Sequence, residues 1–233
     1  MEEFNKKYFE DGDFNRGKTI SFYDIAYSSF IKNNLKKGSK ILEIGCSYGH
    51  LLRELEEKYN TTGIDISAYA INKAKNILKS TKLIQMNIEK DFEKLDNKKF
   101  DAIIAIDVFE HFRKPPGVIR KCFSLLNEGG ILVLKVPNKS SIILNYLKII
   151  GREDMWDCYQ DKTHYSLFGL RKWGGLFEKE GFEVKILASP PTNKLKTLFR
   201  KNPNIFFSRF NLKKLNQTIS LFCYKPIKNE TQN

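Results

Sequence analysis

The sequence predicts an α/β fold in which a mostly parallel sheet carries helices on both faces. Three observations predict it. Short runs rich in Ile, Leu and Val alternate with helical patterns, as they do where strands and helices follow one another in a doubly wound sheet. A glycine turn follows the first run. With 233 residues, of which 41% are hydrophobic, the chain is long enough to bury a sizeable core.

Each strand is predicted from a short apolar run, and each helix from its pattern and its start or stop signal. The expected strands are Lys40–Ile44, Thr61–Ile64, Lys82–Met86, Asp101–Ile106, Gly130–Val136, Phe182–Ala188 and Thr218–Tyr224. The expected helices are His50–Lys58, Ala68–Lys79 and Pro116–Leu126. The last begins at a Pro pair and stops before Gly129-Gly130, which are favourable start and stop residues.

We expect one domain over residues 1–233, made of an N-terminal segment, a core and two insertions. A helical N-terminal segment covers 1–37, the core covers 38–136, and two insertions at 137–181 and 189–217 surround the last strands. The N-terminal segment lies outside the strand–helix alternation. It either packs as a helix with its lead-in or closes over a ligand through Tyr8, Phe9 or Arg16.

Composition points to a reduced, cytoplasmic setting. The sequence has no apolar stretch of 18 residues, so we expect no transmembrane helix, and its polar first residues do not resemble a signal peptide. The four cysteines, Cys46, Cys122, Cys158 and Cys223, are scattered without a CxxC pair. They indicate neither a zinc knuckle nor a disulfide framework.

The turn after the first strand predicts a nucleotide-type ligand that lacks a phosphate. A dinucleotide site usually has three glycines, because its backbone must approach a pyrophosphate. Here only Gly45 and Gly49 are present, with Ser47 in the middle position. Glu43, two residues earlier, would repel a pyrophosphate but suits an ammonium group. S-adenosylmethionine (SAM) has such a group, and backbone N–H groups of the turn can hold its carboxylate.

A second acid supports the same ligand. Asp65 ends the second expected strand and can accept hydrogen bonds from both hydroxyls of a ribose. Ile66 beside it can cover a face of the adenine. Alternatively, Asp65 caps the following helix, a role that Ser67 could also take.

At this point the sequence resembles the class I SAM-dependent methyltransferases. Glu43-x-Gly45-x-x-x-Gly49 followed by Asp65 is similar to their first motif and the next acidic position. FDAIIAIDVFEHF resembles their fourth-strand motif, in the version of the type 11/12 and ubiquinone-biosynthesis-like groups, and LLNEGGILVLKVPN resembles their fifth strand. GFEVKILA and QTISLFCYKP resemble the hairpin that completes a Rossmann-like seven-stranded sheet with an antiparallel C-terminal strand. The resemblance covers about residues 38–225.

The resemblance implies an enzyme that transfers a methyl group from SAM to a nucleophile. The residues expected to bind SAM are Glu43, Gly45, Cys46, Ser47, Gly49, Asp65, Ile66, Asn87, Ile88 and Asp107. Asn87 departs from the family, whose members often have an acid there, but it can still hydrogen-bond the adenine edge. Cys46 is expected to pack inside the turn, because methyl transfer needs no nucleophilic thiol.

Acceptor-side residues are expected at the carboxyl ends of the fourth and fifth strands, where ligands bind in such sheets. His111 and His164 are candidates for the general base, and each could instead fix a loop; His50 is expected at a helix start. Asp107, Glu110, His111 and His164 also resemble the metal-binding set of small-RNA 3′-end 2′-O-methyltransferases. A divalent metal is therefore a candidate, although we do not expect one.

The net charge of +13 lies mostly in the second half. Residues 1–118 hold 20 basic and 18 acidic side chains, whereas residues 119–233 hold 20 and 9. The stretch 189–216 contains seven basic residues, no acid and many apolar side chains. It either packs on the domain with its lysines in water or recruits an anionic acceptor, a membrane surface or RNA.

Three functions remain open from the sequence. The first is methylation of an O or N atom of a small-molecule, sugar-linked or lipid-linked acceptor, probed best by labelled SAM. The second is RNA 2′-O-methylation, which predicts an RNA module that the sequence does not show. The third is a non-catalytic SAM-binding module, which predicts loss of Glu43, Asp65 or the glycines, all of which are present.

Overall fold

The computed structural model describes most of the chain as two compact units. The described residues are 4–10, 19–152, 155, 161–188, 214 and 217–227. One unit comprises Met1–Lys94 and Pro190–Phe210, and the other comprises Leu95–Ser189 and Asn211–Asn233. The predicted insertion at 189–217 lies outside the described residues except for Lys214 and Gln217.

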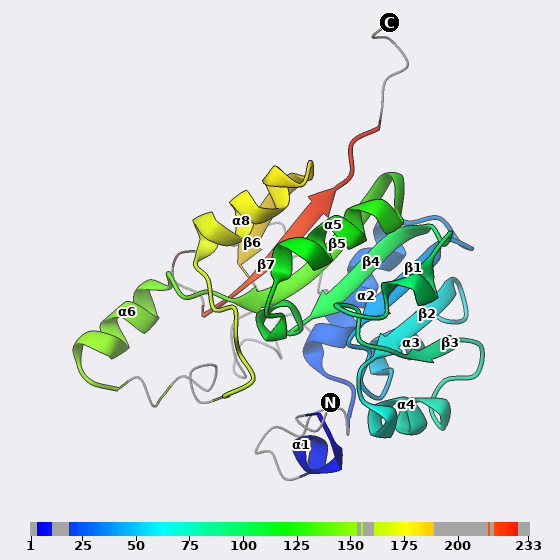
Figure 1. Ribbon diagram of the computed structural model, residues 1–233, viewed down its shortest axis with the longest axis horizontal. Helices are drawn as coiled ribbons and strands as arrows, with labels where there is room; N and C mark the ends of the chain where they lie inside the picture. The colour runs from blue at the N-terminus through cyan, green and yellow to red at the C-terminus, as the bar shows by residue number, and fades with distance from the viewer. Residues whose placement is uncertain are drawn as a thin grey trace, which may run out of the picture. The chain divides into compact units, whose positions relative to one another are not determined.

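Seven strands form a sheet in the order β3-β2-β1-β4-β5-β7-β6 (Figure 1). Their bounds are β1 Lys40–Ile44, β2 Asn60–Asp65, β3 Lys82–Gln85, β4 Phe100–Ile106, β5 Leu126–Pro137, β6 Glu183–Ala188 and β7 Thr218–Tyr224. β1, β2 and β3 run parallel in one unit, and β4 and β5 run parallel in the other. β7 is antiparallel to both β5 and β6. This arrangement confirms the predicted doubly wound, Rossmann-like fold with its antiparallel C-terminal strand.

The helices of the first unit are α1 Lys6–Glu10, α2 Phe22–Asn34, α3 His50–Arg53 and α4 Ala68–Lys75. α2 begins with a capping box, in which the Ser21 hydroxyl accepts from the Asp24 N–H and the Asp24 carboxylate accepts from the Ser21 N–H. Its fully buried side chains Ala26, Tyr27 and Ile31 fix which face of α2 enters the core.

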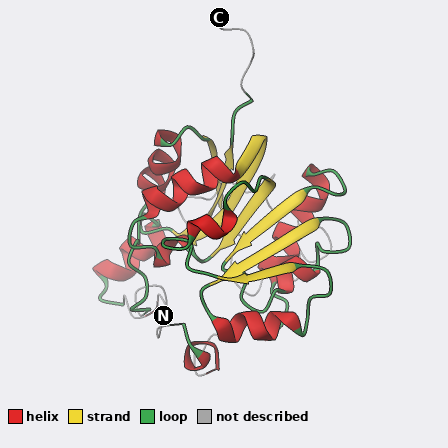
Figure 2. Ribbon diagram, turned by 45° about the vertical axis from the view of Figure 1, so that its right-hand side comes forward, coloured by secondary structure: helices red, strands yellow, loops and turns green. Residues whose placement is uncertain are grey.

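The second unit contains the short 3₁₀ helix η2 (Phe109–His111) and the helices α5 (Pro115–Leu125), α6 (Ile142–Ile149) and α8 (Leu170–Lys179). Another short 3₁₀ helix, η1 (Phe92–Leu95), spans the boundary between the units. α8 packs on β6 and β7, and α5 packs on β5 and α8. Trp173 of α8 is fully buried, and its indole N–H donates to the Pro137 carbonyl at 3.3 Å. Figure 2 shows the strands as a twisted layer and the helices packed beside them.

Several predicted boundaries are wrong by a few residues, for local reasons. α3 ends at Arg53 and α4 at Lys75, because the next residues make i→i−3 turns: Glu54 N–H donates to Leu51, and Ile77 N–H donates to Ala74. The predicted strand start at Gly130 is wrong, because β5 already begins at Leu126. The pairing of β4 with β5 shifts between Phe100 and Ala102, and the two glycines fall within that irregularity.

No helix among the described residues combines the length and the apolar character needed to cross a bilayer.

Candidate functional site

The glycine turn connects β1 to α3 through three residues with positive φ. Gly45 has φ 71°, Ser47 has 49° and Gly49 has 81°. The N–H groups of Gly45 and Cys46 both donate to the Ile64 carbonyl, at 2.8 and 3.0 Å, which ties the turn to β2. A Cβ added at Gly49 would lie 2.4 Å from Leu78 Cδ1. Glycine is required there for both its conformation and its size.

Glu43 is a buried carboxylate whose Oε2 atom has no hydrogen-bond partner. The residue lies on β1 and is 5% exposed. Burial raises the pKa of Glu43 well above its usual value, and the carboxylates of Asp24 and Asp65 raise it further. Leaving such an oxygen unsatisfied is costly, and a ligand ammonium group would satisfy it. The residues present therefore fit the amino group of SAM.

Asp65 at the end of β2 supports the same turn. Its Oδ2 accepts the Ser47 N–H at 2.9 Å, and its Oδ1 accepts the Ser67 N–H at 2.8 Å. Burial raises the pKa of Asp65, and these N–H groups act in the opposite direction. Ser67, not Asp65, caps α4, since its hydroxyl accepts the Ala70 N–H. Each Asp65 oxygen has acceptor capacity left for a ribose hydroxyl, which stays a prediction.

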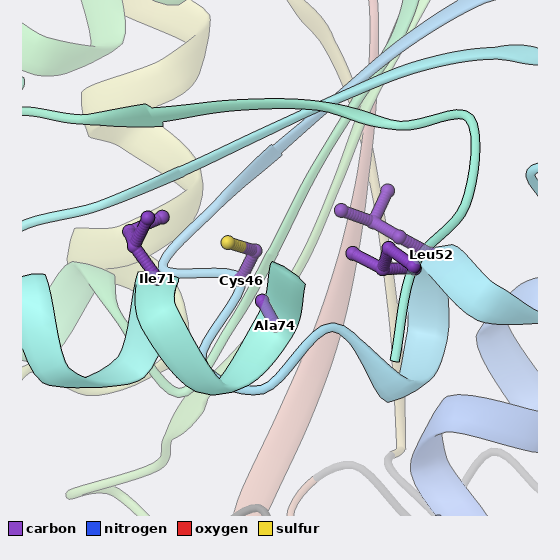
Figure 3. Packing of buried hydrophobic residues seen from close by; sticks show 5 residues of the cluster. Cys46, Leu52, Ile71 and Ala74 are labelled. Atoms are coloured by element: carbon purple, nitrogen blue, oxygen red, sulfur yellow. The ribbon is translucent and has the colours of Figure 1, made fainter. Parts of the chain in front are cut away.

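Cys46 faces the core rather than a ligand. Its side chain packs with Leu52, Ile71, Ala74 and Leu78, and Figure 3 shows the first three of these around it. Burial raises the pKa of the Cys46 thiol well above its usual value, so the thiol stays neutral. The Cys46 side chain therefore contributes packing, as expected.

The residues expected around adenine flank the ends of β2 and β3. Asn87 follows β3, and its Oδ1 accepts the Glu89 N–H at 2.9 Å, which forms a local turn. Ile88 is 4% exposed, whereas Ile66 after β2 is partly exposed. The adenine contacts themselves stay predictions.

An aromatic cluster covers the glycine turn, and its members Tyr48 and Tyr69 were not predicted from the sequence. Phe9 of α1 stacks on Tyr48 with ring centroids 5.6 Å apart and lies 6.2 Å from Tyr69 of α4. The Tyr69 hydroxyl donates to Glu10. α1 therefore packs on the turn, as expected of a packing helix. Tyr48 within the turn was the available signal; Arg16 lies outside the described residues.

In the second unit, Glu110, His111 and His164 come together. One ligand atom from each lies within 4.8 Å of the others, and the two imidazole centroids are 4.6 Å apart. Ser166 joins the segments by donating its N–H to the Glu110 carbonyl and its hydroxyl to the Phe112 carbonyl, both at 2.8 Å. This is the kind of compact carboxylate–imidazole group that binds divalent metals.

A hydrogen-bond chain fixes the tautomer of His111. Its Nδ1 lies 2.9 Å from the Thr163 hydroxyl and 3.1 Å from the Thr163 carbonyl. A carbonyl only accepts, and the hydroxyl donates to Asp161 Oδ1 at 2.5 Å, so Nδ1 carries the proton. In this tautomer Nε2 is the ring nitrogen that can accept a proton or bind a metal. His164 Nε2 lies 3.7 Å from Asp161 Oδ2.

Asp107 is held by a lysine instead of joining this group. Both of its carboxylate oxygens lie 2.5 Å from Lys135 Nζ, and its N–H donates to the Lys135 carbonyl at 3.0 Å. Asp107 has φ 54°, an unusual backbone conformation that is common near functional sites. The lysine side chain is 6% exposed. Sequence analysis missed Lys135, although a lysine in the apolar run LVLKVP is itself a signal.

His50 and the basic stretch 189–216 were also singled out in the sequence. His50 is the first residue of α3, as expected. Of the basic stretch 189–216, only Lys214 is described, and its carbonyl accepts the N–H of Ile142 at 2.8 Å.

Comparisons with known proteins show which proteins this chain is similar to. A methyltransferase domain model matches residues 21–185. The ubiquinone biosynthesis O-methyltransferase of Glaesserella parasuis serovar 5 (strain SH0165) is 31% identical over 208 residues, which cover 83% of this chain and 86% of that protein. The protein of the same name from Coxiella burnetii (strain Dugway 5J108-111) is 33% identical over 140 residues, 57% and 58% of the two chains.

Two solved structures share the fold. The plantazolicin methyltransferase BpumL, in complex with a monoazolic desmethylPZN analog and SAH, aligns with a TM-score of 0.65 at 20% identity and covers 94% and 93% of the two chains. A SAM-dependent methyltransferase from Archaeoglobus fulgidus aligns at 0.62 with 19% identity over 87% and 94%. These two likenesses show the fold alone. The domain match and the O-methyltransferase relatives show that this chain is an enzyme of the class I S-adenosylmethionine-dependent methyltransferase family.

Proposed function

We propose that this chain transfers the methyl group of SAM to an oxygen atom of an anionic small-molecule, sugar-linked or lipid-linked acceptor. The observation that carries the cofactor part is the buried Glu43 oxygen without a hydrogen-bond partner. The choice of oxygen draws on the relatives named as O-methyltransferases. The choice of an anionic acceptor draws on the excess of 20 basic over 9 acidic residues in 119–233.

The first unit supplies the groups that hold SAM. Glu43 accepts from the ammonium group. The N–H groups of Gly45, Cys46, Ser47 and Gly49 donate within the chain, so we assign the Tyr48 N–H of the turn to the carboxylate. Asp65 accepts from the ribose hydroxyls, with Ile66, Asn87 and Ile88 around the adenine. When bound, SAM supplies an activated methyl group on a sulfonium. The chain must then orient the acceptor, exclude water and accept a proton.

The second unit supplies the base. His111 holds its Nδ1 proton through Thr163, and Asp161 orients Thr163 in turn. His111 Nε2 is therefore prepared to take the proton from an acceptor hydroxyl. We assign His164 a supporting role, because its imidazole packs against that of His111 and lies near Asp161.

A second candidate is a metal-assisted version of the same reaction, favoured by the grouping of Glu110, His111 and His164. These three residues would hold a divalent ion, which would lower the pKa of an acceptor hydroxyl and help to orient it. Asp107 is left out of this set, because its carboxylate already pairs with Lys135.

Calorimetry and product analysis test these proposals. SAM should bind and NAD should not; tight NAD binding without SAM binding defeats the cofactor assignment. Mass spectrometry of cell extract incubated with the enzyme and methyl-labelled SAM should identify an O-methylated anion. Methylated RNA alone would favour RNA 2′-O-methylation, and SAM binding without any methylated product would favour a non-catalytic module.

Variants and a chelator distinguish a general-base role of His111 from a role as metal ligand. His111→Ala should lower turnover about 10²–10⁴-fold with SAM affinity unchanged, whereas His50→Ala, outside the group, should not. A metal predicts loss of activity with chelator and calorimetric binding of Mg²⁺, Mn²⁺ or Zn²⁺ that Glu110→Gln abolishes. A chelator-insensitive enzyme without measurable metal binding excludes the second candidate.

We also propose that this chain is located in the cytoplasm. Cys46, Cys122 and Cys223 are free, buried thiols, which suits a reducing compartment.

A further inference from the structure

α6 exposes an apolar face to solvent. Its exposed large side chains are Ile142 (53%), Ile143 (43%), Tyr146 (61%) and Ile149 (82%), and Ile150 follows at 48%. Positions 142, 146, 149 and 150 follow the i, i+4, i+7, i+8 pattern of one helix face. In Figure 1, α6 stands apart from the sheet at the left of the view. Exposed apolar faces of this kind mark surfaces that contact a partner or a membrane.

The helix is attached firmly enough to present that face. Leu144 on α6 is 4% exposed and points into the unit. Ser141, fully buried, accepts the Asn145 N–H through its carbonyl. The Ile142 N–H donates to the Lys214 carbonyl at 2.8 Å, so the end of the basic stretch 189–216 lies against the start of α6. The end of a basic sequence segment is therefore hydrogen-bonded to the start of the helix that carries the apolar face.

The charged residues of α6 and its described flanks are basic, whereas the sequence continues with Glu153 and Asp154. Residues 138–152 contain Lys139, Lys148 and Arg152 and no acidic residue, and all three cations are exposed. Apolar side chains flanked by cations are the pattern of helices that lie in the interface of an anionic bilayer. A second copy of the chain is a poorer occupant, because a two-fold contact would bring these like charges together.

We propose that α6 lies in the headgroup region of an anionic lipid bilayer and attaches the enzyme to the membrane surface. Ile142, Tyr146 and Ile149 enter the apolar boundary, and Lys139, Lys148 and Arg152 contact lipid phosphates. This goes beyond the proposed function, because attachment does not depend on the identity of the acceptor.

Co-sedimentation of the full chain with vesicles tests the proposal. Vesicles of phosphatidylcholine with phosphatidylglycerol should bind the chain more tightly than phosphatidylcholine alone. Replacing Tyr146 and Ile149 by Ser should weaken partition at least about tenfold. Ile227→Ser, which removes another exposed apolar side chain (70% exposed), is the matched control and should bind as the unmodified chain does.

A charge series tests the electrostatic part. Lys148→Gln should weaken binding to anionic vesicles about fivefold and leave binding to neutral vesicles unchanged. Lys179→Gln on α8 makes the same change on another helix and should have little effect. Circular dichroism and SAM calorimetry on each variant show that the fold and the cofactor site are intact.

Two results overturn the proposal. One is the absence of vesicle binding by the unmodified chain; if sedimentation then shows a dimer that Ile149→Ser dissociates, the face is a self-contact. The other is equal loss of binding in Ile227→Ser and the α6 variants. Failure of SAM binding would instead defeat the proposed function, whatever the vesicles show.

Discussion

Replacing Glu43 by Gln should make the protein without ligand more stable while weakening SAM binding. Gln keeps the volume of the side chain but removes a negative charge that lies buried near Asp24 and Asp65. In the folded chain Glu43 Oε2 is without a hydrogen-bond partner. The buried carboxylate therefore lowers the stability of the folded chain until a ligand cation binds to it. Stability and binding should therefore change in opposite directions.

The sign of the pH dependence follows from the raised pKa. A carboxyl group whose folded pKa lies above its unfolded pKa costs no stability at low pH, where both states are protonated. The cost grows as pH rises above the unfolded value of about 4.3 and is complete above the folded value. Glu43→Gln should thus match the unmodified chain near pH 4 and exceed it at neutral pH.

The magnitudes follow from the cost of a buried, unsatisfied polar group. At neutral pH we expect the free energy of unfolding to increase by about 1–3 kcal/mol, measured by urea denaturation. SAM affinity, measured by calorimetry, should fall by about 1.5–3 kcal/mol, the range for hydrogen bonds to charged groups.

Glu56→Gln is the matched control. Burial alone would raise the pKa of Glu56, but the N–H groups of Ser80 and Lys79 and the Thr81 hydroxyl lower it. Its carboxylate therefore stabilises the folded chain, and the same substitution should lower stability and leave SAM affinity unchanged. If Glu43→Gln lowers stability at neutral pH, or leaves SAM affinity intact, the reasoning about the unsatisfied oxygen fails.

Three further predictions concern the turn and the base. Asp65→Ala should weaken SAM binding by about 1.5–3 kcal/mol, measured by calorimetry. It should also lower the free energy of unfolding, measured by urea denaturation, because the N–H groups of Ser47 and Ser67 lose their acceptor. Gly49→Ala should destabilise by about 1–3 kcal/mol, since its Cβ would meet Leu78; unchanged stability would contradict the packing. Thr163→Val should lower kcat at least about tenfold and shift the pH profile with SAM affinity unchanged, and a Thr163→Ser enzyme should regain activity.

The sequence by itself determined the strands, the order of the motifs and the turn. β1 and β7 have the predicted bounds, because a short apolar run between polar residues is a local signal. Gly45 and Gly49 were predicted as a tight turn, because positive φ favours glycine wherever the chain is. The positions of Glu43 and Asp65 at strand ends followed from the same local pattern.

Only the tertiary structure decided which distant groups meet. The chain Asp161–Thr163–His111 depends on how the 161–166 segment is tied to η2, which no local pattern encodes. Lys135 holds Asp107 because β5 pairs with β4, and Phe9 covers Tyr48 because α1 packs on the turn. The apolar face of α6 is exposed for the same kind of reason: periodicity shows that a helix has an apolar face, but only packing shows whether anything covers it.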